Sequence, residues 1–479
     1  MLKRSLLFTA LLLAGCSQQP RYVQPAMPTA PDYPADAWAA SAGPRAVEVE
    51  WRSFFRDPRL QALIERALLH NRDLRTAVLR IEEARGQYRI QRADRLPTVD
   101  GTAGATRSRG EDFQGGTRTD NRFDIGASIA SFELDFWGRI RSLTEAARAN
   151  YLSTIHAQRS FQISLVADVA EAYLTERELD ARIALAQSTV SSRLRALEIA
   201  KLRLDAGVTS ALDYRQVETL LTQAQTELAN LQLQRAQTRN TLEFLVGGPV
   251  PAPLPSPLPL QGQGIIENIT AGLPSDLLIN RPDILEAEEQ LRAANADVGA
   301  ARAAFFPRIS LTGALGLASS ALGGLFSGDA FAWSFGGGAS VPIFDAGRNR
   351  GNLDVAVARR GIATAGYERA IQNAFREVSD RLAARRWLVD RLVSQQREVA
   401  AQRERAELAT LRYQNGVANF LEVLDAQREL FAAEQQALLT RREQLSNAVD
   451  LYVALGGGLD PSSIPIPSDR RVEQRSRQN

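Results

Sequence analysis

The sequence predicts a mixed α and β membrane protein in which one sub-structure is built twice, by an internal tandem duplication. A shift of 209 residues lays Gly207 and Asp213 onto Gly416 and Glu422. Each copy has a long proline-free stretch rich in Ala, Leu, Gln, Glu and Arg, which favours helix. Each copy also has two stretches of about ten residues in which apolar and polar residues alternate, as in strands that cross a membrane.

The repeat extends far beyond these positions, because the same shift lays Gly138-Arg139 onto Gly347-Arg348. We predict a first repeat over 58–248 and a second over 267–457, joined by a Pro-rich linker over 249–266. Solenoid units are about 20 to 50 residues long, so a repeat of this length is a whole sub-structure.

The N-terminus has the three parts of a secretory signal, and we predict a signal peptide over 1–15. The basic pair Lys3-Arg4 precedes an apolar run that ends in Leu13-Ala14-Gly15-Cys16, which resembles a bacterial lipobox. Cys16 is the only cysteine, so a disulfide within the chain is excluded and lipidation of Cys16 is favoured. Ser17 stands where an Asp would favour retention at the inner membrane, which indicates the outer membrane.

After the signal, residues 16–57 carry six prolines and predict an extended, lipidated tether. Without Lys3 and Arg4 the chain has 57 − 2 = 55 basic residues against 55 acidic ones, so nothing indicates nucleic acid as a partner. No further run of about 20 apolar residues occurs, so any insertion into a membrane must use strands.

The first helix is expected to begin at Asp57-Pro58, with Asp as N-cap, and to continue to Ala93. Its counterpart is expected from Ser275 to Ala304 with an interruption near Arg281-Pro282.

The alternating stretches predict one strand hairpin in each repeat, over 98–133 and over 309–344. The loops are expected from Ser108 to Asn121 and from Ser319 to Phe331, and both are Gly-rich, as external loops of outer-membrane proteins tend to be. The alternative is a soluble antiparallel sheet with one wet face. The secreted, lipidated context argues against it.

Long helical hairpins follow over 139–246 and 348–455, with their turns at Gly207 and at Asn415-Gly416. From Arg139 to Ala206 the chain could form a helix about 100 Å long. The glycine pairs at 247 and 456 are interpreted as helix stops. A C-terminal tail is predicted over 458–479, and its last part, Asp469 to Asn479, is interpreted as disordered.

Four strands cannot close a membrane barrel, since the smallest have about eight. Two copies would give eight strands, a barrel filled by its own side chains. Three copies would give twelve strands and a ring of twelve helices, with every strand edge paired. An open conduit therefore favours a homotrimer.

Several segments are similar to the outer-membrane factors of tripartite efflux systems, the TolC and OprM type, in its lipoprotein branch. They include Gly272–Leu278, Ala300–Leu311 and Ala454–Gly458, besides the hairpins themselves. The resemblance implies a trimeric channel-tunnel, with a twelve-strand barrel in the outer membrane and an α-helical tunnel in the periplasm. It also implies a periplasmic adaptor and an inner-membrane pump of the resistance-nodulation-division class. The chain would be the exit duct through which drugs and other small molecules leave.

The family resemblance also implies a periplasmic gate. By position, Glu422 and Asp425 match its acidic rings, and Asp213 with Tyr413 match a hydrogen-bonded pair between helices. Three-fold symmetry would gather up to six carboxylates, favouring cations and raising some of their pKa values. Ala418 departs from the pattern, because related sequences often carry a charged gate residue there. The Gly207 and Gly416 turns are where the adaptor is expected to dock.

Other function classes are less well supported. The two histidines, His70 and His156, lie near no nucleophile motif and no metal-ligand spacing, so we predict no catalytic residue, cofactor or metal. A periplasmic coiled-coil scaffold would leave the four strands unexplained. An exit duct for ATP-driven type I protein secretion would use the same tunnel. We prefer small-molecule efflux to protein secretion by analogy with the lipoprotein branch.

Overall fold

The computed structural model describes residues 17–34, 43–111, 116–250 and 253–458. The predicted signal peptide, the predicted lipidation at Cys16 and all of the predicted C-terminal tail except Gly458 lie outside the described residues. Two compact units are present, and each draws on both repeats. The strand unit groups the residues up to Ala26 with Leu79–Ile155 and Glu286–Arg369. The hairpin unit groups Met27–Val78, His156–Leu285 and the residues from Ala370 onward.

The order of the elements follows the duplication. Four of the long helices below, α4, α5, α8 and α9, contribute residues to both units. The first repeat contains α3 (Pro58–His70), α4 (Arg72–Ala93), β1 (Asp100–Glu111), β2 (Thr117–Leu134), α5 (Arg139–Asp205) and α6 (Ala211–Leu245). The second contains α7 (Leu277–Asn280), α8 (Pro282–Ala303), β3 (Arg308–Ser319), β4 (Phe331–Ser340), α9 (Arg348–Gln414) and α10 (Phe420–Ala454). A short helix, α2 (Trp51–Phe54), precedes them.

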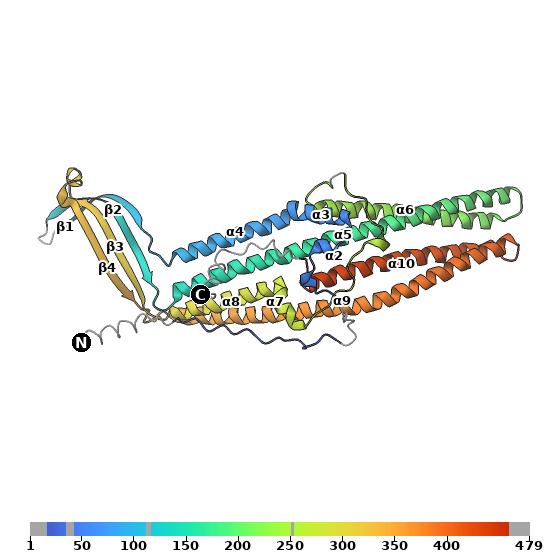
Figure 1. Cartoon of the computed structure of the whole chain (residues 1–479). Helices are drawn as coiled ribbons and strands as arrows, with labels where there is room; N and C mark the ends of the chain where they lie inside the picture. The colour runs from blue at the N-terminus through green and yellow to red at the C-terminus, as the bar shows by residue number, and fades with distance from the viewer. Residues whose placement is uncertain (1–16, 35–42, 112–115, 251–252, 459–479) are drawn as a thin grey trace. The chain divides into compact units, whose positions relative to one another are not determined.

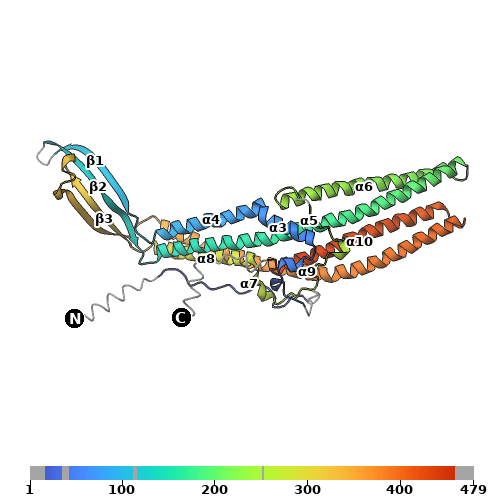
Figure 2. The same ribbon diagram turned by 45° about the horizontal axis from the view of Figure 1, so that its top comes forward.

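All four boundaries of the first helical hairpin recur 209 residues later in the second. The pair α5 and α6 begins at 139 and ends at 245, and the pair α9 and α10 begins at 348 and ends at 454. Within each pair the two helices run side by side in opposite directions (Figures 1 and 2). The predicted helical hairpins and their turns are therefore confirmed. No helix in the described part of the chain combines the length and apolar character needed to cross a bilayer.

The four strands form one antiparallel sheet in the order β1-β2-β3-β4 (Figure 1). The two repeats meet at its centre, where β2 pairs with β3. The expected loop from Ser108 to Asn121 is wrong, because pairing of β1 with β2 continues outward to Glu111 opposite Thr117. Polar residues had indicated a loop there, but threonine and arginine are tolerated in an exposed two-stranded ribbon.

A β-bulge corrects the side-chain alternation within β2. Ile129 lies opposite Gly313 and Phe132 lies opposite Leu311, so β2 has one extra residue between them. An extra residue exchanges the two faces of the strand beyond it. Phe132 and Leu134 thereby join the apolar face of the sheet, although their even numbers would otherwise place them on the polar face.

On the polar face the bulge leaves Glu133 between two arginines. Its carboxylate accepts from Arg139 Nε at 2.8 Å and lies 3.2 Å from Arg308 Nε. The hydrogen bond with Glu133 raises the pKa of Arg139 above its ordinary value. The ion pair between Glu133 and Arg139 connects the end of β2 to the first residue of α5.

The expected continuous helix from Pro58 to Ala93 is wrong, because it breaks at Asn71. Asn71 Oδ1 accepts from the Leu74 backbone N–H at 2.9 Å, as an N-cap does, and its Nδ2 donates to the Leu245 carbonyl. In the second repeat, where the interruption near Arg281 was predicted, Arg281 donates to the Ala454 carbonyl at 3.0 Å. Each break thus satisfies the C-terminal end of the returning helix of its own repeat.

Asp57 anchors the hairpin unit. It caps α3 as predicted, accepting from the Arg59 N–H at 2.9 Å, and it is fully buried. Its other oxygen accepts from the Tyr173 hydroxyl of α5 at 2.6 Å and from the Leu258 N–H of the linker at 3.1 Å. A buried carboxylate with three donors ties the start of α3, α5 and the linker together.

The N-terminal residues 17–24, here called the strap, lie along α8 in the strand unit. The Asn295 side chain donates to the Pro20 carbonyl at 2.8 Å, and the Tyr22 hydroxyl donates to Glu288 at 3.1 Å. A Cβ at Gly299 would lie 2.6 Å from the Gln19 Cα, so only glycine leaves room for the strap. The Ser17 backbone lies beside Gly138, just after the end of β2.

Candidate functional site

The two hairpin turns have the same backbone. Gly207 and Gly416 have φ of +70° and +71°, a left-handed conformation that favours glycine. Val208 N–H donates to the Arg203 carbonyl and Val417 N–H to the Arg412 carbonyl, each at 2.9 Å, which is the Schellman pattern that ends a helix. Nothing lies within 4 Å of a Cβ built on either glycine. Both glycines are therefore required by the turn itself and not by packing within the protomer.

Asp213 is part of the first returning helix's cap. Ser210 and Asp213 form a reciprocal capping box, and the Asp213 carboxylate accepts from the hydroxyls of Ser210 at 2.8 Å and Thr209 at 2.9 Å. These hydrogen bonds, Ser210 first, hold the pKa of Asp213 below its ordinary value. Asp213 is thus a fixed carboxylate in the first turn of α6.

Glu422 occupies the same position in the second repeat but has a different partner. Asn419 caps α10 by accepting from the Glu422 N–H at 3.1 Å, while the Glu422 carboxylate lies 3.3 Å from Arg412 Nε. The residue equivalent to Thr209 is Ala418, which has no hydroxyl to offer. Because of Ala418, Glu422 therefore lacks the counterpart of the hydrogen bond by which Thr209 holds Asp213 in its cap.

Asp425 lies one turn further along α10 and is also paired, with Arg428 at 3.1 Å. The side chains of Glu422 and Asp425 are each 42% exposed. The structure therefore presents both predicted acidic residues at the surface of the hairpin, each beside an arginine that offsets part of its charge.

Tyr413 is held by its ring. The ring packs on Phe420 with centroids 4.8 Å apart, and the Arg203 guanidinium of the first hairpin lies 5.4 Å from the Tyr413 centroid. The structure forms no hydrogen bond between Tyr413 and Asp213, both of which it describes. The predicted hydrogen-bonded pair is not formed within the protomer, and a cation–π contact links the two hairpins instead.

An apolar core lies beneath these polar contacts. Val217 of α6, Ala200 of α5 and Leu424 of α10 form a buried cluster that Phe420 also contacts. Phe420 belongs as well to a second cluster that includes Ala406, Ala409 and Val423. A single aromatic side chain thus packs against both hairpins near their tips.

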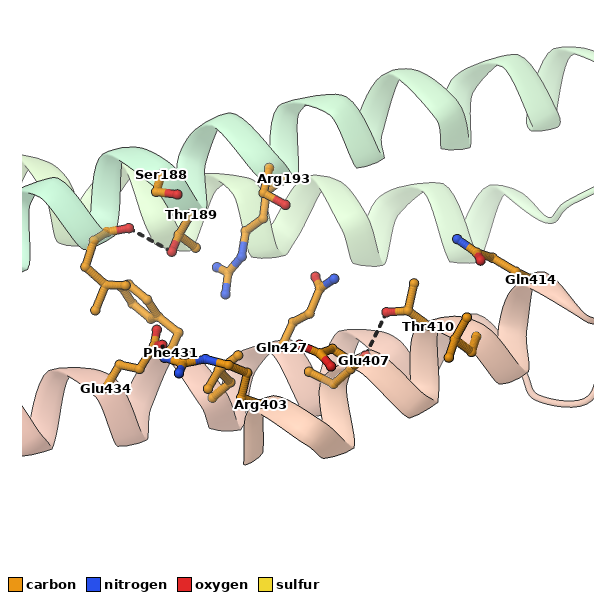
Figure 3. Close-up of a pocket in the computed structure, with 15 residues that line it drawn as sticks. Ser188, Thr189, Arg193, Arg403, Glu407, Thr410, Gln414, Gln427, Phe431 and Glu434 are labelled. Atoms are coloured by element: carbon orange, nitrogen blue, oxygen red, sulfur yellow. Dashed lines mark hydrogen bonds and ion pairs between the residues drawn. The ribbon is translucent and has the colours of Figure 1, made fainter. Parts of the chain in front are cut away.

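A groove separates the hairpins further from the turns (Figure 3), with a volume of about 620 Å³. Arg193 enters it from α5, and Phe431 and Glu434 from α10. Arg193 is 6% exposed, donates to the Leu220 carbonyl and lies 5.7 Å from the Phe431 centroid. Burial lowers the pKa of Arg193. On the other wall Arg403 is paired with Glu434 at 2.6 Å.

A carboxyl pair that sequence reasoning missed lies between α5 and α10. Glu171 hydrogen-bonds Asp450, whose carboxylate lies 3.0 Å from Arg381 of α9. Burial, and then the contact with Asp450, raises the pKa of Glu171 to about 8. Two carboxyl groups can share a hydrogen bond only if one keeps its proton. Their only sequence signal was acidic residues on helices, which usually lie on solvated faces.

The chain matches the model of the family described as outer membrane efflux protein, over residues 63–248 and 273–457. The chain belongs to the outer membrane efflux protein family.

Several members of this family are similar over nearly the whole chain. It is 45% identical to "Solvent efflux pump outer membrane protein SrpC" of Pseudomonas putida, over 94% of this chain and 97% of that protein. It is 42% identical to "Outer membrane protein OprJ" of Pseudomonas aeruginosa, over 95% and 96%. The solved structure of the open state of the Neisseria gonorrhoeae MtrE outer membrane channel matches with a TM-score of 0.85 at 40% identity, covering 93% of this chain and 99% of that one.

Membership of the outer membrane efflux protein family identifies the chain as the outer-membrane component of an efflux pump, a channel and not an enzyme. It also means that further pump components work with it. The predicted fold class is confirmed in its internal duplication, its four antiparallel strands and its long helical hairpins. The gate roles of Glu422, Asp425, Asp213 and Tyr413 stay predictions.

Proposed function

We propose that the chain forms a homotrimeric exit duct, in which three sheets close a twelve-strand barrel and the hairpins continue it as a periplasmic tunnel. The observation that carries the proposal is the sheet itself. It has one apolar face, and the outer edges of β1 and β4 pair with no described strand. Such edges cannot remain unpaired in lipid, so neighbouring copies must supply the missing hydrogen bonds.

The cargo proposed is drugs, organic solvents and other small molecules. The relatives' names support this class, since they speak of solvent and antibiotic efflux. The duct would offer passage only, and selection would lie with a resistance-nodulation-division pump in the inner membrane, joined to the duct by a periplasmic adaptor.

The hairpin tips would dock the adaptor. Around the Gly207 and Gly416 turns the same apolar side chains are exposed in both repeats, Val208 and Val417 at 65% and 67%. Exposed valines beside two identical turns offer each adaptor subunit an equivalent apolar contact. The gate would be the ring of tips, with Glu422 and Asp425 lining it and the Phe420 core holding the hairpins together.

Cys16 would carry the lipid anchor. The strap supports this, because Ser17, the residue after Cys16, lies beside Gly138, and the Gln18 N–H donates to the Trp137 carbonyl, next to the ends of the strands. An acyl group on the preceding residue would therefore lie near the inner edge of the membrane-spanning sheet.

Two measurements test the proposal. The purified chain should migrate as a trimer after crosslinking and give stepwise conductance in a planar bilayer. Cells that lack the gene should become more sensitive to antibiotics and toluene, and the wild-type gene should restore resistance. A monomeric protein without conductance, or unchanged sensitivity in the deletion strain, would reject the exit-duct function.

A further inference from the structure

The outer part of the β1–β2 hairpin carries two arginines on the face that is apolar elsewhere in the sheet. This apolar face contains rows of partners across the strands, such as Ala103, Ile125, Leu317 and Phe331. It ends at the row of Ala105 and Phe123. The next two residues of β1 on the same face are Arg107 and Arg109, opposite Asn121 and Thr119. The change from apolar to basic residues is therefore abrupt and confined to one face.

The length of the apolar face places these arginines at the membrane surface. From Phe123 to Leu134, allowing for the bulge, β2 covers about 34 Å, or about 26 Å along the membrane normal at a tilt of about 40°. That matches the apolar band of about 25 Å in outer-membrane barrels. Arg107 and Arg109 then lie about 5 and 10 Å beyond the hydrocarbon, at headgroup level.

The two faces of this ribbon differ in how their arginines are paired. On the opposite face Arg118 and Arg122 are neutralised by Asp120 at 2.7 Å and Asp124 at 3.3 Å. Among the residues that the structure describes, Arg109 donates only to the Thr117 hydroxyl, at 3.3 Å, and Arg107 forms no ion pair.

Of the acidic residues that the structure describes in this ribbon, one shares the face with these arginines. Glu111 lies beyond Arg109, opposite Thr117. The lipid-side face of the ribbon therefore keeps a net positive charge, carried by the two arginines nearest to the apolar band.

We infer that Arg107 and Arg109, with the polar side chains of Asn121 and Thr119, bind phosphate groups of outer-leaflet lipids. The inference rests on the proposed function, since it needs the sheet to cross the outer membrane with this hairpin outside. A guanidinium can hold a phosphate through two parallel hydrogen bonds, and a hydroxyl or amide opposite it supplies a further donor. The ligand is a lipid and not free phosphate, because the site continues the lipid-facing surface. A trimer would hold three such sites around its rim.

The test uses the purified full-length trimer and a bisphosphorylated glycolipid, lipid A, with binding followed by native mass spectrometry. The double variant Arg107→Gln, Arg109→Gln should bind the lipid roughly tenfold to thirtyfold more weakly than the wild type. The control is Arg118→Gln, Arg122→Gln, which removes the same charge from the other face and should bind as the wild type does. Lipid A stripped of its phosphates should bind the wild type as weakly as intact lipid A binds the double variant.

With lipid A as the probe, three results would overturn the inference: equal binding by the double variant, an equal loss in the control, or undiminished binding of the dephosphorylated lipid. Competition by inorganic phosphate at equal concentration would assign the site to free anions instead and would also overturn it. Trimer formation and conductance of the wild type, measured on the same sample, test the proposed function separately.

Discussion

Tyr413 distinguishes two accounts of how the hairpin tips are held. If its hydroxyl mattered, through the predicted bond with Asp213, Tyr413→Phe would loosen the tips. The structure instead places the ring against Phe420 and under Arg203. An aromatic pair contributes about 0.5–1.5 kcal/mol and an exposed cation–π contact about 0.5–1 kcal/mol. Loss of both contacts in Tyr413→Ala removes about 1–2.5 kcal/mol from the packed tips, a roughly 5- to 70-fold change in an equilibrium.

The assay is the open probability of single channels in a planar bilayer, at constant salt. Tyr413→Ala should be open several-fold more often than the wild type, and Tyr413→Phe should behave as the wild type. Leu204→Ala, which alters the equivalent position of the first repeat, controls for the loss of side-chain volume. If Tyr413→Phe opened the channel as much as Tyr413→Ala, the hydroxyl would be the important group and the ring-packing account would be refuted.

Three further predictions follow from backbone and burial. Gly416→Ala places a Cβ at φ +71° and should destabilise the protein by about 1–2 kcal/mol through the hairpin turn. Gly361→Ala lies within α9 and should instead stabilise the helix by up to about 1 kcal/mol. Denaturant unfolding compares the two variants, and equal effects would contradict the strain argument. Gly299→Leu should displace the strap at Gln19 and expose it to protease, which Gly361→Leu should not do; identical digestion of both variants would show that the strap is not held there. The folded chain keeps a proton on Glu171 up to about pH 8 that the unfolded chain releases near pH 4.5, so the free energy of unfolding should fall as pH rises between these values and level off above 8. Glu171→Gln should flatten this dependence, and an unchanged slope in that variant would assign it to other groups.

Most of the architecture could be predicted because it depends on patterns that repeat. The 209-residue shift gave both helical hairpins, since Gly207 and Gly416 each require a left-handed backbone that few other residues adopt. Alternation located the four strands because one face of the sheet is apolar from the row of Ala105 and Phe123 inward.

Features that depend on a single contact could not be predicted. The break at Asn71 was missed because asparagine within a polar helical stretch is unremarkable until the Leu245 carbonyl approaches it. The bulge after Ile129 was missed because only pairing with β3 shows that Phe132 changes face.

The candidate site divides in the same way. The positions of Glu422 and Asp425 on one helix face followed from their spacing, but their arginine partners did not. Arg193 gave no signal, because an arginine on a helix is usually solvated and its burial arises from Leu220 and Phe431 on other helices. Neither contact is local in sequence.

The two hairpins share every helix boundary and yet differ at Thr209 and Ala418. A ring assembled from six identical half-length chains would have to give all of its tips the same polar contacts, so any change would appear six times at once. Joining two copies in one chain halves that constraint. In the proposed trimer, alternate hairpins could then diverge, one set keeping its carboxylate in a cap while the other pairs it with an arginine. Selection could then adjust the proposed gate without altering the backbone around it.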